Sequence, residues 1–441
     1  MLYLFLIALA SSFLSSCSCT QTSSPDPYSL NIAIYDEPTT LSPEQAKRSL
    51  ELSIAKLLFE GLTRENHNKE ELFELALADS YISEEEEKRH IFHLKEALWS
   101  DGSPLLAHDV VKAWEHAQIH SPHQEIFQGL SFFAPAPTTV IVISDVPYPD
   151  LPKLLAFPAF AIYQPQYPHI YSGPFILEKH VPGQSFSFKK NPYYYDVDIV
   201  PMEKIQLIVL PDIYTARHLM SREKIHWLGQ PWHQGIPKEL QTHPKILYHN
   251  YPVEGTFWLS LNIDSPQLSN PVNRYRLAAA INKEALIKDA LEGSQQPAYT
   301  ISKHSETSLP SLPSFSLSLA QETLTLTYPI NILRCQRIAE VLREQLRASG
   351  IYLNLNGLEY HCFLNKRNLK DYTLATQTKV AYYPKATLLP NEAQKLQNLE
   401  IIPLYHLNYD FLSLNPIKNI LFNASGAVDL KYASIEELVH K

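Results

Sequence analysis

The stretch HIFHLKEALWSDGSPLLAHDVVKAW, residues 90–114, contains a strand pattern, a tight corner and a helix pattern in succession. Residues 90–94 alternate apolar and polar side chains, as a half-buried strand does. Asp101 and Gly102 favour a turn, and we expect Trp99 to pack beneath it. From Asp109 onward the apolar residues recur at helical spacing. The stretch therefore predicts a hairpin corner leading into a helix that faces a core.

The same alternation of strands and helices extends in both directions from this stretch. Residues 30–35 alternate as a strand, and 42–58 carry apolar residues at helical spacing after a Ser-Pro pair. The charged run at 84–90 predicts the turn of a hairpin, and TVIVIS at 139–144 predicts a buried strand. Further strands are predicted at 175–177, 185–189, 205–210 and 256–261, and helices at 213–221, 271–292 and 334–349. The Ser- and Pro-rich residues 302–319 predict a surface connection.

Composition limits the function before any motif is considered. The chain has 441 residues, 45% of them apolar and 19% charged, which is enough for several cores. Its net charge of −9 provides no basic surface for phosphates, so we expect no nucleic acid partner. Only 12 glycines are present, which disfavours a Gly-rich nucleotide loop.

The N-terminus has the pattern of an export signal. Residues 1–14 are apolar but too short to span a bilayer as a stable helix. Leu14-Ser15-Ser16-Cys17 resembles a bacterial lipobox, although no Lys or Arg precedes it. We expect residues 1–16 to be a signal peptide, Cys17 to be lipidated and residues 17–28 to be a tether. An ordinary cleaved signal is the alternative. Either way the protein is exported, to the periplasm or the cell surface.

Several segments, in order, resemble the extracytoplasmic solute-binding proteins of peptide ABC transporters, the family of oligopeptide, dipeptide and nickel binders. The most specific match is residues 92–111, including Leu98-Trp99-Ser100-Asp101-Gly102-Ser103-Pro104. The other matching segments are 37–43, 58–63, 172–175, 182–185, 190–194, 205–211, 258–262 and 276–287.

This resemblance implies an α/β, bilobal periplasmic-binding-protein fold with an extra subdomain and mixed sheets flanked by helices. It also implies a monomer that is not an enzyme, has no cofactor, binds a peptide or peptide-like ligand by hinge closure and delivers it to ABC permease subunits. The expected boundaries are 29–62, 173–255 and 402–441 for lobe I, 63–172 for the extra subdomain and 256–401 for a shortened lobe II.

The resemblance also suggests which residues contact the ligand. Glu37, Pro38, Thr39 and Thr40 follow the first strand and resemble a family loop that faces the ligand. From the opposite lobe we expect contributions from Tyr382 and Tyr383, and from Tyr405 near the returning strand.

Two departures from the family pattern bear on the ligand. Peptide-binding members carry an Asp that pairs with the ligand's amine, and Ala381 stands in its place. Glu37 or Asp371 could compensate, since a buried ammonium without a counter-charge is costly. In addition, several tens of residues are missing between Leu389 and Ile402, so lobe II is smaller. These departures keep open a degenerate surface or sensory lipoprotein, or a metal-chelate binder.

Other chemistry is weakly supported by the residues. No G-x-S-x-G occurs, and Cys335 has no nearby His in sequence, which disfavours a hydrolase. His116, His120 and His123 have a spacing that can bind a metal, but a solvated helix end explains them better. The acidic run at 84–87 lacks the alternation of a calcium loop. Cys335 and Cys362 could form a disulfide or remain buried thiols.

Overall fold

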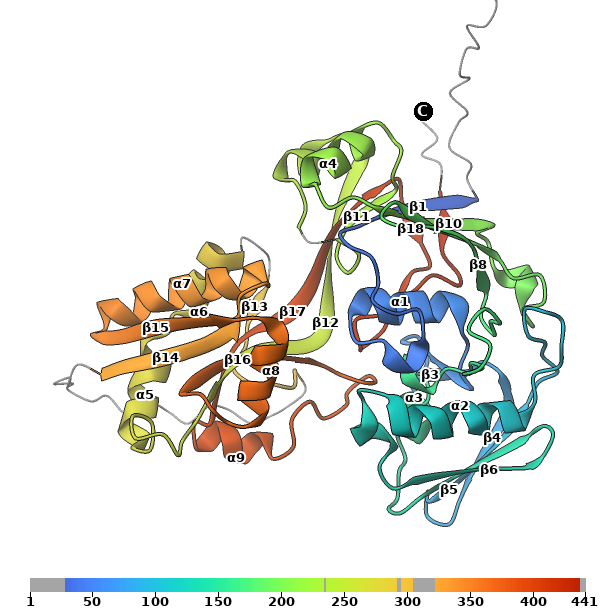
Figure 1. The fold of residues 1–441 in the computed structure, drawn as a ribbon, viewed down its shortest axis with the longest axis horizontal. Helices are drawn as coiled ribbons and strands as arrows, with labels where there is room; N and C mark the ends of the chain where they lie inside the picture. Colours follow the sequence, from blue (N-terminus) through green and yellow to red (C-terminus); the bar gives the residue numbers. More distant parts are fainter. Residues whose placement is uncertain (1–27, 234, 292–294, 304–321, 437–441) are drawn as a thin grey trace, which may run out of the picture.

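The computed structural model describes residues 28–233, 235–291, 295–303 and 322–436, which form two lobes joined by two long strands. These strands are β12 (Ile246–Leu261) and β17 (Ile401–Leu414), which pair antiparallel and run through the centre of an eleven-stranded sheet (Figure 1). The sheet order is β15 (Ile351–Leu358), β14 (Glu322–Pro329), β16 (Leu374–Val380), β12, β17, β11 (Trp227–Gly229), β1 (Ser29–Ile34), β10 (Lys204–Val209), β9 (Ser185–Lys190) and β8 (Phe175–Val181), with β13 (Gln296–Pro297) on β17. The predicted bilobal α/β fold is confirmed.

The pairing of β12 with β17 is interrupted where the chain passes from one lobe to the other. Register runs regularly from Ile246 opposite Leu414 to Pro252 opposite Asn408, then shifts before Thr256 meets His406. A β-bulge bends a strand, and here both connecting strands bend together. Gly255 lies in this bend, and a side chain there would approach the carbonyl oxygen of Lys379 to 2.8 Å. The interruption therefore lies where the chain passes between the lobes, at a position where a side chain larger than glycine does not fit.

Lobe II holds β14, β15 and β16, which run parallel, with helices on both faces. Helix α7 (Leu333–Ala348) follows β14 and presents a buried apolar stripe to β14 and β15, while α8 (Tyr360–Asn368) follows β15. The remaining helices of this lobe are α5 (Pro271–Ala280), α6 (Lys283–Leu286) and α9 (Glu392–Gln397), with a π-helical turn at Ile287–Leu291.

Lobe I holds β1 and its neighbours, α1 (Ser49–Leu58) and α4 (Ile213–Ser221). An extra subdomain extends from it, in which α2 (Ala107–His120) covers one face of a four-stranded antiparallel sheet. That sheet runs β4 (Ala78–Glu84), β5 (Arg89–Leu94), β7 (Thr139–Ser144) and β6 (Leu130–Ala136). The small elements are β2 (Thr63–Glu65), β3 (Phe73–Leu75), α3 (Leu151–Leu154), β18 (Ile417–Lys418), β19 (Leu421–Phe422), β20 (Val428–Asp429), β21 (Ser434–Ile435) and 3-10 helices at Pro43–Gln45, Gln124–Phe127, Pro158–Phe160, Val197–Ile199 and Lys238–Thr242.

The predicted corner at Trp99 and the hairpin before it are confirmed. The amide of Gly102 donates to the carbonyl of Trp99 at 2.9 Å, and Gly102 has a φ of +85°, which favours glycine. Trp99 is 1% exposed and packs in the core. β4 and β5 pair around the charged turn at 85–88.

Two predicted helices are wrong in extent. The first does not begin at Ser42: residues 46–48 are extended because the amides of Lys47 and Arg48 donate to the carboxylate of Glu51, so α1 begins at Ser49. The helix expected over 271–292 breaks at Ile281, where the Asn282 side chain accepts from the amide of Ala285 and starts α6. The strand expected at 256–261 is longer, since it starts at Ile246.

Three further expectations concern the termini, the cysteines and residues 302–319. Cys17 and the signal peptide lie outside the described residues, as do 304–321. Cys335 and Cys362 are both free, the first buried and the second exposed, so they form no disulfide. No helix in the described part of the chain has the length and apolar character needed to cross a bilayer.

Candidate functional site

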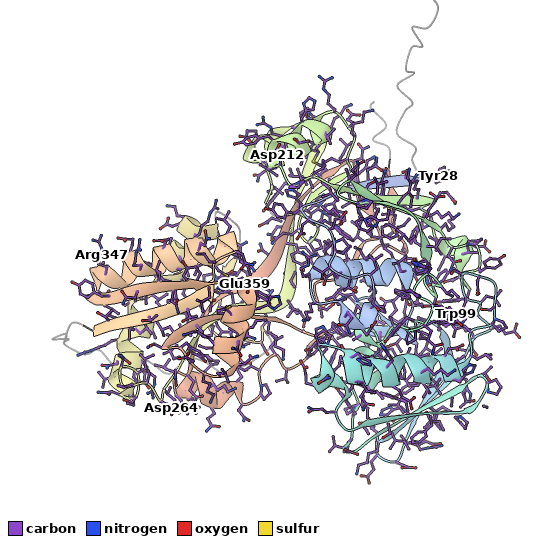
Figure 2. The ribbon with its side chains drawn as sticks, in the orientation of Figure 1. Tyr28, Trp99, Asp212, Asp264, Arg347 and Glu359 are labelled. Atoms are coloured by element: carbon purple, nitrogen blue, oxygen red, sulfur yellow. The ribbon has the colours of Figure 1, made fainter. Side chains whose placement is uncertain are left out.

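The carboxyl ends of the parallel strands of lobe II form the edge of that lobe nearest to lobe I. β14 lies between β15 and β16, so the crossovers through α7 and α8 lead to opposite sides of β14. Ligands of open α/β sheets bind at such switch points. Ile330, Leu333 and Tyr360 are 46%, 53% and 39% exposed there. Glu359, which caps α8, marks the same end in Figure 2, and Arg347 marks the opposite end of the lobe. We call residues 329–334 and 358–360 the lobe II edge.

Lobe I repeats this arrangement around β1. β1 lies between β11 and β10 and is parallel to both, and its carboxyl end at Ile34 leads into the loop that carries Glu37 to Thr40. In Figure 1 this end of β1 points toward the connecting strands. The predicted loop therefore leaves a switch point of lobe I.

The loop after β1 is held by hydrogen bonds within lobe I. The carboxylate of Glu37 accepts from the amide of Gly183 at 2.6 Å and lies 3.3 Å from His180, and these hydrogen bonds lower the pKa of Glu37. Thr39 donates from its amide and its hydroxyl to Glu51, at 3.0 and 2.6 Å. The hydroxyl of Thr40 accepts from the amide of Ser42 at 3.0 Å. Pro38 is half-buried. As ligand contacts, these four residues stay predictions.

We predict that Glu51 stabilises this loop in a pH-dependent way. Burial opposes its ionisation, but hydrogen bonds from Thr39, Lys47 and Arg48 lower its pKa to about 2, from an ordinary 4.5. The folded state therefore binds fewer protons, and the stabilisation is present above pH 4.5 and is lost as pH falls toward 2. Glu51→Gln should lower the free energy of unfolding by ~2 kcal/mol at pH 7 and by much less near pH 2. Urea denaturation at both pH values measures this, and an equal loss at both would contradict it.

Tyr382 and Tyr383, which follow β16, contact the extra subdomain directly. The hydroxyl of Tyr382 donates to the carboxylate of Glu125, and its ring lies edge-on to Phe157 at 5.0 Å and to His123 at 5.6 Å. Tyr383 shares a hydrogen bond with Tyr148. Burial, and then the Glu125 carboxylate, raise the pKa of Tyr382. These two tyrosines thus join lobe II to the extra subdomain, and their predicted role as ligand contacts stays a prediction. We call them the latch.

Removing the latch should shift the lobes toward an open arrangement. Tyr382→Ala removes one hydrogen bond to a charged group and two ring contacts, so the ratio of open to closed molecules should rise about tenfold. Small-angle X-ray scattering should then show a larger radius of gyration without ligand. Tyr352→Ala, which removes an exposed ring of lobe II far from the other lobe, is the matched control. An unchanged radius for Tyr382→Ala would contradict the latch.

Tyr405 lies on β17 within the connecting strands and is 1% exposed. Its ring stacks on Phe257 at 5.2 Å, and burial raises its pKa to about 12. Its hydroxyl has no hydrogen-bond partner among the described residues, which is costly for a buried polar group. The structure brings Tyr405 together with neither Glu37 to Thr40 nor the latch.

Arg334 is a candidate binding residue that the sequence did not reveal. It lies in the first turn of α7 at the lobe II edge. Its pKa is raised, mainly by Tyr405, while burial opposes this rise and Cys335 and Tyr409 add to it. In the described part of the chain no carboxylate pairs with Arg334. Tyr409 in turn donates to Ser49, the first residue of α1 in lobe I, at 2.7 Å. Arg334 is thus a half-buried cation in the first turn of α7 that pairs with no carboxylate of the described residues. Its place after a parallel strand could have singled it out.

The two acids expected to compensate for Ala381 are occupied elsewhere. Glu37 is bonded to the turn between β8 and β9, and Asp371 pairs with Lys366 at 3.0 Å on the surface of lobe II. The acid that contacts the segment after β16 is Glu254, in the hinge bend. Its carbonyl accepts from the amide of Ala381, and its carboxylate accepts from the amide of Lys385, both at 2.8 Å.

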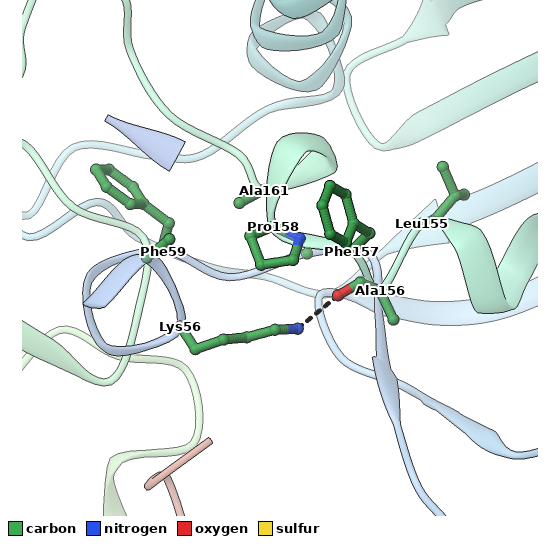
Figure 3. A pocket seen from close by; sticks show the side chains of 9 residues that line it. Lys56, Phe59, Leu155, Ala156, Phe157, Pro158 and Ala161 are labelled. Carbon is green, nitrogen blue, oxygen red and sulfur yellow. Dashed lines mark hydrogen bonds between the residues drawn. The ribbon is translucent and has the colours of Figure 1, made fainter. Parts of the chain in front are cut away.

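A small pocket lies between α1 and the segment at 155–161. Phe157, whose ring contacts Tyr382 of the latch, is one of the residues that line it. It is lined by Ala55, Lys56, Phe59, Gly61, Leu155, Ala156, Phe157, Pro158 and Ala161 (Figure 3). Lys56 is its one charged side chain and donates to the carbonyl of Ala156 at 2.5 Å. Burial lowers the pKa of Lys56, and Asp429 is its strongest opposing charge. The pocket wall is thus part of the lobe I core.

The structure gives no support to metal or nucleophilic sites. His116 bonds to Tyr163 and His123 to the carbonyl of Ala46, and no cluster of three potential metal ligands occurs among the described residues. Burial raises the pKa of Cys335 to about 11, so its thiol is protonated and unreactive at neutral pH.

The two α/β lobes joined by two long strands have the architecture of a periplasmic binding protein. The family model of bacterial extracellular solute-binding proteins, family 5, middle region, matches residues 73–315, and the chain belongs to this family.

Among curated relatives, the oligopeptide-binding protein OppA of Bacillus subtilis is 24% identical over 303 residues, covering 61% of this chain and 55% of OppA. The probable deoxycholate-binding periplasmic protein YgiS of Escherichia coli is 24% identical over 380 residues, covering 77% of this chain and 66% of YgiS. The chain therefore spans between half and two thirds of the length of these relatives.

Solved structures share the fold at low identity. Brucella suis NikA in complex with Fe(III)-EDTA superposes with a TM-score of 0.78 at 16% identity, covering 93% of this chain and all of that one. The Escherichia coli murein tripeptide binding protein MppA gives 0.75 at 18%, covering 93% and 98%. Listeria monocytogenes OppA bound to peptide gives 0.73 at 18%, covering 94% and 100%.

Proposed function

We propose that this protein captures peptides, either oligopeptides or cell-wall peptide fragments, by hinge closure and delivers them to an ABC permease. The observation that carries the proposal is Arg334, a half-buried arginine at the lobe II edge that has no acidic partner among the described residues. An arginine in such a place suits a carboxylate, which it can bind through two parallel hydrogen bonds. Every peptide with a free C-terminus carries one.

A peptide ligand is supported by the oligopeptide, murein tripeptide and glutathione binders among the relatives, which also include a probable deoxycholate binder and a protein in complex with Fe(III)-EDTA. A ligand closes the lobes only through contacts that it makes in the closed state and lacks in the open state. The loop after β1 in lobe I and the lobe II edge supply two such sets of contacts. Binding of this kind alters no covalent bond of the ligand.

We further propose that the protein is a monomer held at the membrane by a lipid on Cys17. Acyl chains contribute roughly 0.8 kcal/mol per buried methylene, so several of them keep a soluble body at the bilayer surface. Cys17→Ser should release the full chain into the soluble fraction of cells, as detected by immunoblotting. Continued membrane association of that variant would contradict the anchor.

Thermal stability tests the ligand class. A solute that binds only the folded state at 100 times its Kd stabilises by about 2.7 kcal/mol, which raises Tm by a few degrees. We expect such a rise with dipeptides to pentapeptides or with muropeptides. A rise with nickel complexes alone would favour the metal-chelate alternative, and no rise with any of them would favour a non-transport surface or sensory lipoprotein.

A further inference from the structure

The outer face of the four-stranded sheet in the extra subdomain carries an apolar row. Ile82, Ile91, Ile141 and Phe133, one from each strand, lie directly opposite one another in register. Ile82 and Phe133 at the two ends are 50% and 49% exposed. An antiparallel sheet with one solvated face normally alternates polar residues outward, so an unbroken row of this kind is unusual.

The face that bears the row is the one that α2 leaves uncovered. The alternate residues of the same strands, such as Phe92, Val140, Val142 and Phe132, point inward and are buried. In Figure 1 the sheet forms the outer end of the extra subdomain, with α2 on its inner side. The row is therefore accessible in the described structure and is remote from the latch and the lobe II edge.

The charges that border the row are predominantly acidic. The end of β4 and the turn after it contribute Glu84, Glu85, Glu86 and Glu87, and Asp145 follows β7. Lys88 and Arg89 are the basic residues there, and Arg89 already pairs with Glu84. Ile143 and Val146, 38% and 64% exposed, extend the apolar surface toward this acidic turn.

We propose that this row is a docking surface for a protein segment that presents apolar side chains next to lysines or arginines. Three strand spacings of about 4.8 Å make the row ~14 Å long, which matches about nine residues of a helix. The acidic border selects a basic partner and disfavours an anionic bilayer and, with the chain's net charge of −9, a second copy. This goes beyond the proposed function, because neither the ligand nor the lobe closure uses this face.

Two synthetic amphipathic helical peptides test the proposal with the full chain. Both carry the same Leu and Ile face, and one has lysines and the other glutamates on its polar face. We expect fluorescence anisotropy to show binding of the lysine peptide only, weakening as salt increases. Phe133→Ser should reduce this affinity about tenfold or more, as truncation of an interface anchor does. Ile119→Ser, at a site 66% exposed on α2, is the matched control and should have no effect.

The charge preference has its own variant. The double variant Glu85→Lys with Glu86→Lys should bind the lysine peptide more weakly and should bind the glutamate peptide. Circular dichroism checks that the variant keeps its fold. Equal binding of both peptides to the unaltered protein, or unchanged binding by Phe133→Ser, would overturn the proposal. So would dimerisation in analytical ultracentrifugation that Phe133→Ser abolishes, or binding to phosphatidylglycerol vesicles that exceeds binding to the peptide.

Discussion

Replacing Arg334 with alanine is expected to weaken peptide affinity about 100-fold or more. Truncating one partner of a buried, hydrogen-bonded charge pair costs ~2–5 kcal/mol of binding, much of it because the other charge is left buried and unpaired. In this protein the charge left without a partner would be the ligand's carboxylate. Isothermal titration calorimetry with the best peptide from the thermal screen measures the loss. The peptide affinity of Arg334→Lys should lie between those of the unaltered protein and of Arg334→Ala. An ammonium keeps the charge but cannot form the two parallel hydrogen bonds of a guanidinium.

The controls separate a ligand role from a structural one. Arg334 has no acidic partner in the described chain, so its loss should leave Tm of the unliganded protein unchanged or slightly higher. Arg347→Ala, on the same helix at the far end of lobe II and 67% exposed in its side chain, should leave affinity unchanged. A peptide amidated at its C-terminus should bind Arg334→Ala and the unaltered protein alike. A loss of less than threefold with the free-acid peptide would refute the carboxylate role.

The sequence predicts the local elements of this fold well because their signals are local. The strand at 139–144 and the helix at 213–221 have the predicted bounds, since β-branched residues and helical spacing act within a few positions. It underestimates β12 because the part of this strand before the hinge, including His249 and Asn250, lacks a continuous apolar pattern. That part is held by pairing with β17, more than 150 positions away.

The candidate site is predicted less well, because its contacts are between lobes. The sequence singles out Tyr382 and Tyr383 as candidate contacts, but no local feature shows that the hydroxyl of Tyr382 bonds to Glu125, 257 positions earlier. In the same way, Arg334 resembles any arginine in a helix until the parallel strand β14 places it at the lobe II edge. Local patterns thus locate the loops of the site, and only topology shows which of them face each other.

The second large effect is expected in the lobe I core, where Asp429→Asn should lower the free energy of unfolding by about 3–5 kcal/mol. Arg64 is 1% exposed and pairs with Glu60 and Asp429, each at 2.8 Å, which joins β2 to β20 near the C-terminus. Asparagine keeps the size of the side chain but removes its charge. The buried guanidinium of Arg64 is then left with one acidic partner, Glu60. Urea denaturation measures the loss, and Asp371→Asn, which breaks the exposed pair with Lys366, should change stability by less than ~0.5 kcal/mol.

A double variant shows whether the loss reflects the charge pair or the packing around it. If Asp429→Asn acts by leaving Arg64 under-compensated, then Arg64→Met combined with Asp429→Leu should recover part of the stability, because apolar replacement of a whole buried pair is often neutral or favourable. If packing alone mattered, the double variant should be at least as unstable as the sum of Arg64→Met and Asp429→Leu measured singly. We expect this recovery to be incomplete, because Asp429 is also the acid that most strongly favours the charged form of the buried Lys56. Without Asp429, Lys56 loses that compensation. A loss below 1 kcal/mol for Asp429→Asn would show instead that Glu60 alone compensates Arg64.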